Sequence, residues 1–269
     1  LSVNIVHCLS EWQALRPSLG GSVGFVPTMG ALHEGHLSLL RASAEDNDVT
    51  VLSIYVNATQ FNDPADLAKY PSTLEADLVA AKAAGVDWVL LPDYSQIYAD
   101  GYRYQLTEES FSQQLCGTDR PGHFTGVLTV VMKLLNLVSP DRAYFGLKDF
   151  QQFTLIKDMC RTFFMPVEIV GCEIVRERDG LAMSSRNQLL TDQGRQLAGR
   201  FNQLLANAVD DEHARQGLRA AGMQVAYVET VGARRCGAVV IGEGDEAVRL
   251  IDNVPVDVAE DSLPLQDIA

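Results

Sequence analysis

Apolar and polar positions follow two different periods along the first 175 residues. Short, nearly continuous apolar runs predict five strands: Val23–Thr28, Val49–Val56, Val86–Pro92, Arg142–Gly146 and Val167–Val175. Stretches with helical spacing come between and after them, at about residues 36–44, 72–85, 125–137 and 149–162. Continuous apolar runs are typical of parallel strands that helices cover on both faces. The pattern therefore predicts an α/β fold with a Rossmann-like, doubly wound parallel sheet.

The pattern changes after about residue 176. Two stretches with helical spacing, 189–209 and 212–222, precede strand-like runs at 225–231 and 237–254. The last run contains Gly242 and Gly244 in its middle, which predicts a hairpin. We therefore expect a Rossmann-like domain at residues 1–175 and a smaller C-terminal α+β lid domain at residues 176–269.

Composition and charge narrow the class of function. The net charge of −14 over 269 residues disfavours nucleic acid as a partner. No apolar stretch is long enough for a membrane span, and no export signal is recognisable at the N-terminus, so we expect a cytoplasmic protein without a membrane partner. The five cysteines form no CxxC pair, which argues against structural zinc and a disulfide framework. We expect no metal site built from protein side chains.

The segment PTMGALHEGH, residues 27–36, leaves the first predicted strand and enters a predicted helix. Doubly wound sheets bind ligands at the carboxyl ends of their strands, and the backbone amides at a helix N-terminus favour anions. Gly30 and Gly35 permit close approach of the backbone to a ligand. His33 and His36 are expected to donate hydrogen bonds to phosphate oxygens and to stabilise charge on a leaving pyrophosphate. The alternative is that the two histidines only cap the helix.

A second candidate segment, DGLAMSSRN at residues 179–187, follows the last predicted strand of the sheet. Ser184 and Ser185 offer hydroxyl and amide donors, and Arg186 offers a forked cation for phosphates. Alone, these three residues are explained as well by a solvated turn. Together with HxGH, the segment resembles the mobile loop of the class I nucleotidyltransferase and aminoacyl-tRNA synthetase superfamily.

Seven segments, in order, resemble one family within that superfamily, pantothenate synthetase (pantoate–β-alanine ligase). They are PTMGALHEGH, YVNATQF, DLAKYPST, RPGHFTGV, YFGLKDFQQ, DGLAMSSRN and RLIDN. The resemblance covers residues 1–190 and the C-terminal tail. It implies an ATP-dependent ligase of pantothenate biosynthesis, in which the carboxylate of pantoate attacks the α-phosphorus of ATP and pyrophosphate leaves. The amine of β-alanine then attacks the pantoyl adenylate and releases AMP. Mg²⁺ accompanying ATP, and a homodimer, are also implied.

The resemblance assigns catalytic roles to three residues. Lys148 would stabilise the transition state, and His36 matches the family's proton donor, although charge stabilisation by His33 and His36 explains as much. The residues implied in ATP binding are Met29, Gly30, His33, His36, Gly146, Leu147, Lys148, Asp149, Val175, Met183, Ser184, Ser185 and Arg186.

Two glutamines are implied in substrate binding. Gln60 and Gln152 would bind pantoate, and Gln60 would also bind β-alanine. The roles of Arg120 and His123 stay open between orienting the substrate, closing the site and packing a loop. Ala58 stands where the family usually has proline, and the C-terminal part is shorter than is typical, so this chain departs from the family at the loop before Gln60 and in the lid.

Other functions remain as alternatives. A nucleotidyltransferase that releases its adenylylated product would not need the paired glutamines. An aminoacyl-tRNA synthetase is disfavoured by the negative charge and by the lack of an added RNA-binding domain. A catalytically silent nucleotide-binding protein is disfavoured because His33, His36, Lys148 and residues 184–186 are all retained.

Overall fold

The computed structural model describes residues 3–257 of the chain. By its internal contacts the chain separates into two compact units. The first contains the chain up to Leu147 and residues 151–173, and the second contains residues 148–150 and the chain from Ile174 onward. The domain bounds drawn from the sequence, 1–175 and 176–269, stay a prediction.

The first unit is built on a six-stranded sheet in which all neighbouring strands are parallel. The strand order is β1-β4-β3-β2-β5-β6. The strands are β1 (Asn4–Val6), β2 (Val23–Thr28), β3 (Val49–Ile54), β4 (Trp88–Leu90), β5 (Arg142–Gly146) and β6 (Glu168–Cys172).

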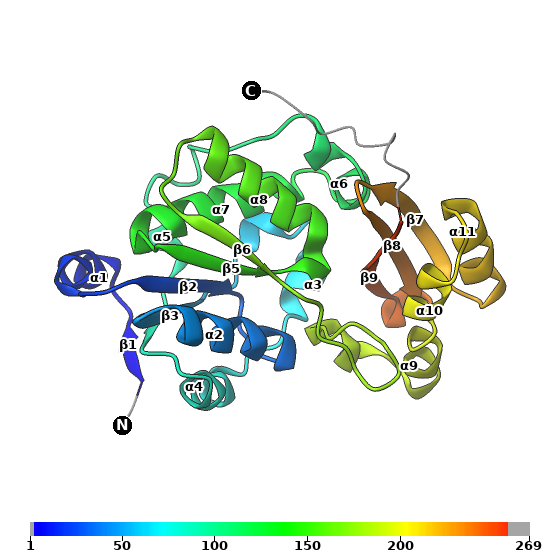
Figure 1. Cartoon of the computed structure of the whole chain (residues 1–269), viewed down its shortest axis with the longest axis horizontal. Coiled ribbons are helices and arrows are strands. Elements are labelled where there is room, and N and C mark those ends of the chain that lie inside the picture. The colour runs from blue at the N-terminus through cyan, green and yellow to red at the C-terminus, as the bar shows by residue number, and fades with distance from the viewer. Residues whose placement is uncertain (1–2, 258–269) are drawn as a thin grey trace. The chain divides into compact units, whose positions relative to one another are not determined.

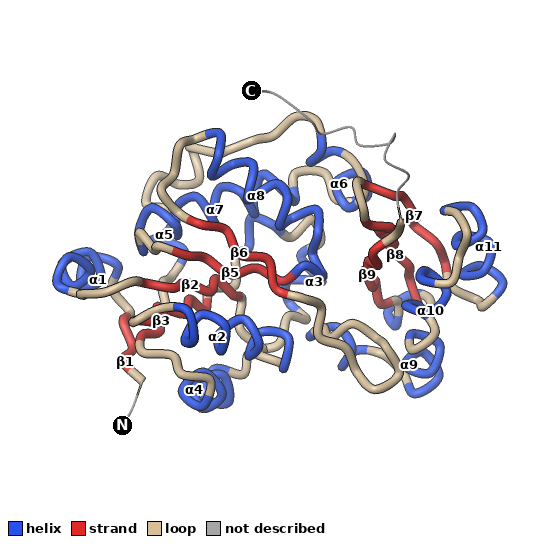
Figure 2. Tube along the Cα trace, in the orientation of Figure 1, coloured by secondary structure: helices blue, strands red, loops and turns tan. Residues whose placement is uncertain are grey.

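Helices cover both faces of this sheet. Figure 1 shows α2 (Glu34–Asp46) and α4 (Leu74–Ala83) along one face, and α7 (His123–Val138) and α8 (Phe150–Thr162) along the other. Figure 2 shows the same arrangement as a layer of strands between layers of helices. Shorter helices are α1 (Leu9–Leu15), α3 (Pro64–Ala68), α5 (Tyr94–Ile97) and α6 (Cys116–Asp119). The predicted doubly wound parallel sheet is thus confirmed.

The long apolar stretch of residues 126–138 lies within α7 and is largely buried. Lys133 belongs to this helix, and its Nζ bonds to the carbonyl of Ile97 at 3.0 Å and to Asp100 Oδ1 at 2.9 Å. A core helix accommodates a lysine in this way because the ammonium is paired as it leaves the apolar layer. Among residues 3–257, no helix is both long and apolar enough to cross a membrane.

The chain reverses its direction of winding between β2 and β5. From β2 the chain passes through α2 to β3 on one side, whereas β5 pairs with β2 on the other side. β2 and β5 are paired only at Gly24↔Arg142 and Phe25↔Ala143, near their amino ends. In open α/β sheets, ligands bind at the carboxyl ends of the strands at such a point. The segments that leave β2 and β5 are therefore the first places to look for a site.

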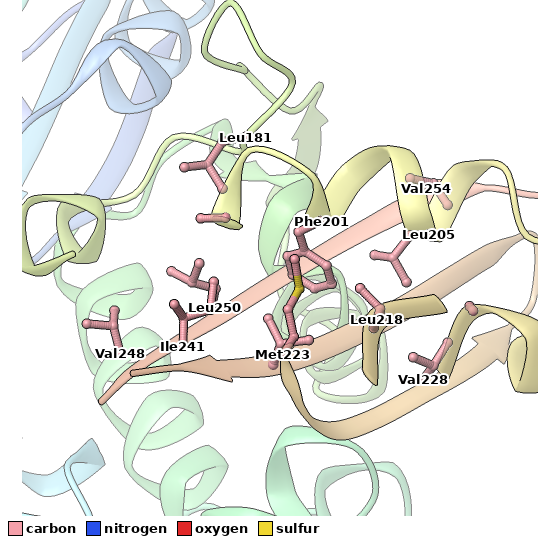
Figure 3. Packing of buried hydrophobic residues seen from close by; sticks show 13 residues of the cluster. Leu181, Phe201, Leu205, Leu218, Met223, Val228, Ile241, Val248, Leu250 and Val254 are labelled. Carbon is pink, nitrogen blue, oxygen red and sulfur yellow. The ribbon is translucent and has the colours of Figure 1, made fainter. Parts of the chain in front are cut away.

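The second unit contains a three-stranded antiparallel sheet of order β7-β8-β9. Its strands are β7 (Gln224–Val231), β8 (Arg234–Ile241) and β9 (Val248–Pro255), and its helices are α9 (Asp192–Ala198), α10 (Phe201–Ala206) and α11 (Asp211–Ala220). Phe201 and Leu205 of α10 and Leu218 of α11 pack with apolar residues of the strands in one buried cluster (Figure 3). This confirms the expected small α+β part.

The structure adds β1 and α1 before the first predicted strand, in a segment for which there was no prediction from the sequence. The single helix expected over residues 189–209 is wrong: residues 185–189 form a 3-10 helix, and α9 and α10 follow as separate helices. Thr191 caps α9 by accepting a hydrogen bond from the amide of Gly194, and α9 ends before Gly199. The hairpin around Gly242 and Gly244 is confirmed, since both have positive φ and join β8 to β9.

Two buried tyrosines of the first unit provide a stability prediction. The hydroxyl of Tyr55 is buried and has no hydrogen-bond partner among the described residues, and burial raises the pKa of Tyr55. The hydroxyl of Tyr144 contacts Asn47 Nδ2 at 2.7 Å and Asp46 Oδ2 at 3.0 Å. An unmade buried hydrogen bond costs free energy, whereas a made one stabilises.

We expect Tyr55→Phe to raise the free energy of unfolding by up to about 1 kcal/mol and Tyr144→Phe to lower it by about 1 kcal/mol. Urea denaturation of the two variants beside the parent chain measures both changes. Equal destabilisation by the two substitutions would contradict the assignment of Tyr55 as unpaired.

Candidate functional site

The segment after β2 has an unusual backbone held by one buried carboxylate. Gly30 and Ala31 both have positive φ, at +81° and +51°. Asp77, on α4 and only 3% exposed, accepts hydrogen bonds from the amide of Ala31 at 2.9 Å and from the amide of Leu32 at 2.8 Å. Thr73 Oγ1 lies 3.2 Å from both oxygens of Asp77. The carboxylate thus stabilises a left-handed turn that a non-glycine residue disfavours.

This turn brings the two histidines together at the start of α2. His33 is the N-cap of the helix, and its Nδ1 accepts a hydrogen bond from the amide of Gly35 at 3.2 Å. His36 Nδ1 accepts a hydrogen bond from the amide of His33 at 3.4 Å, which completes a capping box. The two ring centroids are 4.1 Å apart. The alternative drawn from the sequence, that the histidines cap a helix, therefore describes part of what they do.

The capping hydrogen bonds also indicate which nitrogen of each histidine ring carries the proton. A backbone amide only donates, so each Nδ1 that accepts from one carries no proton. In the neutral state the proton of both rings is therefore on Nε2, which makes Nε2 of His33 and of His36 a hydrogen-bond donor.

The backbone amides of the turn are used within the protein. The amide of Gly30 donates to Thr28 Oγ1 at 3.2 Å, and those of residues 31, 32, 33 and 35 donate to Asp77 and to the two imidazoles. These five amides are therefore occupied within the chain, and the expectation that amides at the N-terminus of α2 bind an anion stays a prediction. The Nε2 groups of the two imidazoles are further donors in this segment.

The segment after β3 positions Gln60. β3 ends at Ile54, and Gln60 is the last residue of a 3-10 helix, Ala58–Gln60. Asn57, which is 1% exposed, donates from Nδ2 to Gln60 Oε1 at 3.0 Å. Asn57 Oδ1 accepts from the hydroxyl of Tyr98 at 2.8 Å and from Thr59 Oγ1 at 3.0 Å. Burial raises the pKa of Tyr98 to about 12, so this hydroxyl stays a donor.

Arg120 and His123 hold the backbone of Gln60. Its carbonyl lies 2.9 Å from His123 Nδ1 and 3.3 Å from Arg120 NH2, and Arg120 NH1 lies 3.1 Å from His123 Nε2. Because a carbonyl only accepts and a guanidinium only donates, His123 is neutral with its proton on Nδ1. A Cβ on Gly126 would come within 2.6 Å of the carbonyl oxygen of Thr59, so glycine is required for this approach. Of the roles that the sequence left open for Arg120 and His123, these contacts show the packing of a loop, since both residues hold the backbone of Gln60.

The two adjacent glutamines of α8 differ in their environment. Gln151 is buried and bonds to the amide of Cys116 and to the carbonyls of Phe111 and Gln114. Gln152, the predicted substrate ligand, is partly exposed on the same helix. Gln151 is therefore the structural member of the pair, and Gln152 is the one with a surface to offer a ligand.

Met29, Gly146 and Leu147 also lie at the carboxyl ends of the strands in the first unit. Met29 follows β2, and Leu147 follows Gly146, the last residue of β5. A Cβ on Gly146 would meet no described atom within 4 Å, so packing within the chain does not require glycine at this position.

The remaining candidate residues belong to the second unit. Lys148 and Asp149 lie in a 3-10 helix, with Lys148 Nζ 3.6 Å from Asp149 Oδ2. The carbonyl of Val175 accepts a hydrogen bond from the amide of Met183 at 3.0 Å, and Arg176 bridges Ala182 as in an antiparallel pair. Residues 175–183 thus form a hairpin, which turns at Gly180 with φ at +91°.

The hairpin leads into the serine–arginine segment, residues 184–186. Ser184 caps a 3-10 helix, Ser185–Leu189, by accepting a hydrogen bond from the amide of Arg186 at 3.3 Å. Before the turn, Asp179 is held by Arg195 of α9 through contacts of 2.5 and 3.2 Å. This hydrogen bond keeps the pKa of the Asp179 carboxyl below its usual value. The segment is thus anchored on both sides by side chains of its own unit.

Some functional candidates were not visible in the sequence. Asp77 and Asn57 were not singled out, although each is a buried polar residue that holds a predicted site segment. Asp77 could have been noticed because it is a charged residue at a helix position where the pattern predicts an apolar residue facing the sheet. For Asn57 the available signal was the three-residue spacing to Gln60.

Comparisons with known proteins agree with this geometry. A family model described as pantoate-beta-alanine ligase matches residues 3–255. Pantothenate synthetase of Bdellovibrio bacteriovorus is 52% identical over 252 residues, which are 94% of this chain and 99% of that protein. The Legionella pneumophila (strain Lens) protein of the same name is 49% identical over 253 residues, 93% and 99% of the two chains. The short C-terminal part is therefore shared with these relatives.

Two solved structures are also similar over nearly their whole length. The crystal structure of pantoate-beta-alanine ligase from Francisella tularensis, complexed with beta-gamma ATP and beta-alanine, has a TM-score of 0.87 at 37% identity and covers 94% of this chain and 98% of that one. Pantothenate synthetase from Thermus thermophilus has a TM-score of 0.85 at 36% identity, with coverage of 94% and 99%.

The turn after β2 provides a second prediction. Asp77→Asn replaces one acceptor by an amide donor that faces two backbone amides, so the turn loses a buried hydrogen bond. We expect a loss of about 1–3 kcal/mol in the free energy of unfolding, measured by urea denaturation. Glu75→Gln, on the exposed side of the same helix, is the matched control and should change stability little. A stability equal to that of the control would contradict the role given to Asp77.

Proposed function

We propose that this chain, which belongs to the pantoate–β-alanine ligase family, condenses pantoate with β-alanine to pantothenate at the expense of ATP. The observation that carries the proposal is the family match over residues 3–255, with relatives near 50% identity over almost their full length. The products are pantothenate, AMP and pyrophosphate, which makes the enzyme a ligase that forms a carbon–nitrogen bond.

The first half-reaction needs cations and hydrogen-bond donors at the phosphates. A carboxylate oxygen of pantoate attacks the α-phosphorus of ATP, the bond to the bridging oxygen breaks, and pyrophosphate carries away the electron pair. We assign to Lys148 the stabilisation of charge in this transition state. His33 and His36 donate from Nε2 to phosphate oxygens, and the capping bonds on Nδ1 support this role because they keep both rings in the required tautomer.

The second half-reaction needs an oriented acid and a neutral amine. The nitrogen of β-alanine attacks the carbonyl of the pantoyl adenylate, AMP leaves, and the amine loses a proton. Gln60 and Gln152 are the proposed substrate ligands, because an amide both accepts from hydroxyls and donates to a carboxylate. Asn57 donates to Gln60 Oε1 and so orients the amide, which supports a role of the Gln60 Nε2 group as a donor to the substrate.

The proposed ATP contacts follow the family motifs. They comprise Met29, Gly30, His33, His36, Gly146, Leu147, Lys148, Asp149, Val175, Met183, Ser184, Ser185 and Arg186. The cap formed by Ser184 supports the role of Arg186, because it fixes the backbone from which the arginine side chain projects.

Mg²⁺ is proposed to reach the enzyme with ATP. Within residues 3–257 no group of three or more His, Cys, Asp or Glu side chains could hold a metal ion. Mg²⁺ is commonly bound through substrate phosphates and water with few protein ligands, which fits this composition. The ion would supply charge neutralisation on the phosphates.

A cytoplasmic location and a homodimer complete the proposal. All five cysteines are free thiols, which suits a reducing compartment. The homodimer rests on the family resemblance, and light scattering of the purified chain measures the mass that it requires.

The test of the function follows the two half-reactions separately. With ATP, Mg²⁺ and pantoate alone, we expect about one equivalent of pyrophosphate per enzyme, because the adenylate stays bound. Addition of β-alanine should start steady formation of AMP and pantothenate. Continuous pyrophosphate release without β-alanine would instead support a nucleotidyltransferase that releases its product, and no pyrophosphate under either condition would overturn the proposal.

The same assay tests the role in the transition state that is assigned to Lys148. Lys148→Ala should lower the rate of pyrophosphate formation by about 10²–10³-fold, the effect typical of losing one preorganised charge donor at a transition state. Lys157→Ala, on the exposed side of α8, is the matched control and should keep the parent rate. Equal rates for the two variants would remove Lys148 from the catalytic set.

A further inference from the structure

Two consecutive buried polar residues interrupt the apolar pattern of β9. Asp252 is 3% exposed and Asn253 is 1% exposed, although β9 otherwise contributes apolar residues to the core of the second unit. They belong to the segment RLIDN, residues 249–253, whose role the proposed reaction does not explain. Buried polar groups cost free energy unless they are paired, so their partners indicate what they do.

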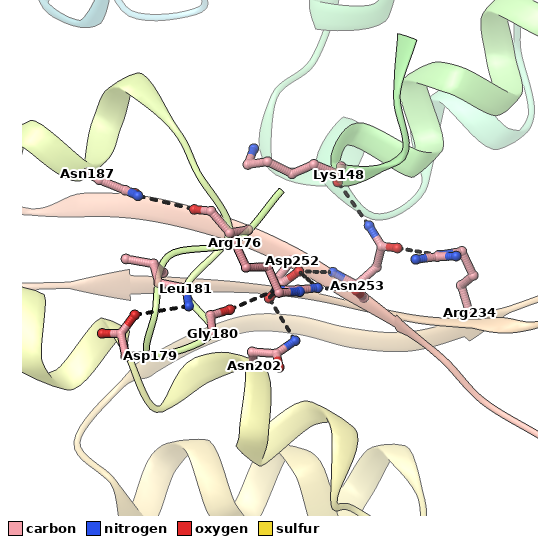
Figure 4. A network of polar contacts seen from close by, with 11 residues as sticks. Lys148, Arg176, Asp179, Gly180, Leu181, Asn187, Asn202, Arg234, Asp252 and Asn253 are labelled. Atoms are coloured by element: carbon pink, nitrogen blue, oxygen red, sulfur yellow. Dashed lines mark hydrogen bonds and ion pairs between the residues drawn. The ribbon is translucent and has the colours of Figure 1, made fainter. Parts of the chain in front are cut away.

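Asp252 is paired with the hairpin that precedes the serine–arginine segment. Its two oxygens lie 2.7 Å and 3.0 Å from the two terminal nitrogens of Arg176. Arg176 also donates to the carbonyl of Gly180 at the turn of the hairpin, at 3.0 Å, and to the carbonyl of Asn253 at 3.2 Å. The amide of Asn253 donates back to Asp252 Oδ1 at 2.7 Å. The ion pair thus fixes the backbone of Asn253 and the turn of the hairpin at one point (Figure 4).

The side chain of Asn253 reaches the backbone of the proposed catalytic lysine. Its Nδ2 donates to the carbonyl oxygen of Lys148 at 3.0 Å, and its Oδ1 accepts from Arg234 Nε (Figure 4). Because a guanidinium only donates and a carbonyl only accepts, both ends of the amide are oriented by their partners. The guanidinium of Arg234 also lies 5.7 Å from the ring of Phe150, two residues after Lys148.

We propose that Asn253 is a positioning residue that holds the peptide of Lys148 in place for the first half-reaction. The inference rests on the proposed function, since it needs Lys148 to act in adenylation. Lys148 lies in the three-residue 3-10 helix, Leu147–Asp149, that leads directly into α8, so its peptide belongs to the first turn of a helical run, where helices are least regular. A hydrogen bond from a buried, doubly oriented amide adds a restraint from outside the helix. Arg176 donates hydrogen bonds to the carbonyl of Asn253 and to the carbonyl of Gly180, so it links this position of β9 to the hairpin that precedes Ser184.

The position of a lysine backbone matters because its ammonium must meet charge that exists only in the transition state. A displacement of about 1 Å in such a group costs on the order of 10²-fold in rate. Aminolysis of the adenylate takes place after pyrophosphate has left, so it does not depend on this restraint in the same way. The two half-reactions should therefore respond differently to loss of Asn253.

Two substitutions remove the hydrogen bond to Lys148 but differ in charge and in the contact that they keep with Arg234. Asn253→Asp keeps an oxygen for Arg234 but has no donor for the carbonyl of Lys148. Asn253→Ala removes both contacts and adds no charge. Asn207→Asp is the matched control, because Asn207 is exposed at the end of α10 in the same unit and undergoes the same change of charge. Single-turnover pyrophosphate release measures adenylation, and pantothenate formation from synthetic pantoyl adenylate and β-alanine measures aminolysis.

We expect both Asn253 variants to slow adenylation by about 10–100-fold while aminolysis of the synthetic adenylate stays near that of the control. The inference is overturned if either variant keeps the parent rate of adenylation. It is equally overturned if both half-reactions slow to the same extent, since that indicates a general structural role. The parent chain and Lys148→Ala in the same assay separate the two claims. If the parent chain releases no pyrophosphate, the proposed function is wrong. If the parent chain is active and the Asn253 variants adenylate at the parent rate, only the inference about Asn253 is wrong.

Discussion

The carboxylate of Asp77 accepts hydrogen bonds from two successive backbone amides, and the arrangement of the residues after β2 depends on it. Without these bonds the left-handed pair Gly30 and Ala31 would lose the interaction that offsets its backbone strain. The same turn places His33 as the cap of α2, so that His33 and His36 exchange hydrogen bonds with the helix backbone. The hydrogen bonds from the amides of Gly35 and His33 to the two Nδ1 atoms indicate that the proton of each neutral imidazole is on Nε2. This is why a helix-capping role and a phosphate-binding role are compatible in these two residues.

Buried polar side chains play the same part in other candidate segments. Asn57 orients the amide of Gln60, while Asn253 orients the peptide of Lys148. In each case the polar residue is almost fully buried and its own orientation is fixed by a second partner, Tyr98 or Arg234. A half-satisfied buried amide would cost stability, whereas a fully paired one fixes a single geometry. In both segments a buried amide therefore fixes the orientation of a residue to which the proposal assigns a role in the site.

The sheet was predictable because continuous apolar runs identify parallel strands regardless of tertiary contacts. β1 was missed, since it has three residues and only Val6 is buried. The break between α9 and α10 was missed. A Cβ on Gly199, at this break, would come within 2.4 Å of Asp179, a tertiary contact that no local pattern reveals. Motif residues were found by their spacing, whereas Asp77 lies 45 and 46 residues from the amides that it binds, so no local pattern connects them. Local sequence thus identified the candidate site residues. Only the structure identified the buried residues that position them.

In the proposed reaction, the carboxylate of pantoate attacks the α-phosphorus of ATP, and the amine of β-alanine then displaces AMP. The most direct measurement uses pantoate with ¹⁸O in both carboxylate oxygens, turned over with ATP and β-alanine and followed by mass spectrometry of the products. The account predicts one ¹⁸O atom in each AMP and the other in the amide carbonyl of pantothenate, because the attacking oxygen leaves with the phosphorus. Unlabelled AMP, with ¹⁸O in inorganic phosphate and ADP as the second product, would mean attack at the γ-phosphorus and would contradict it.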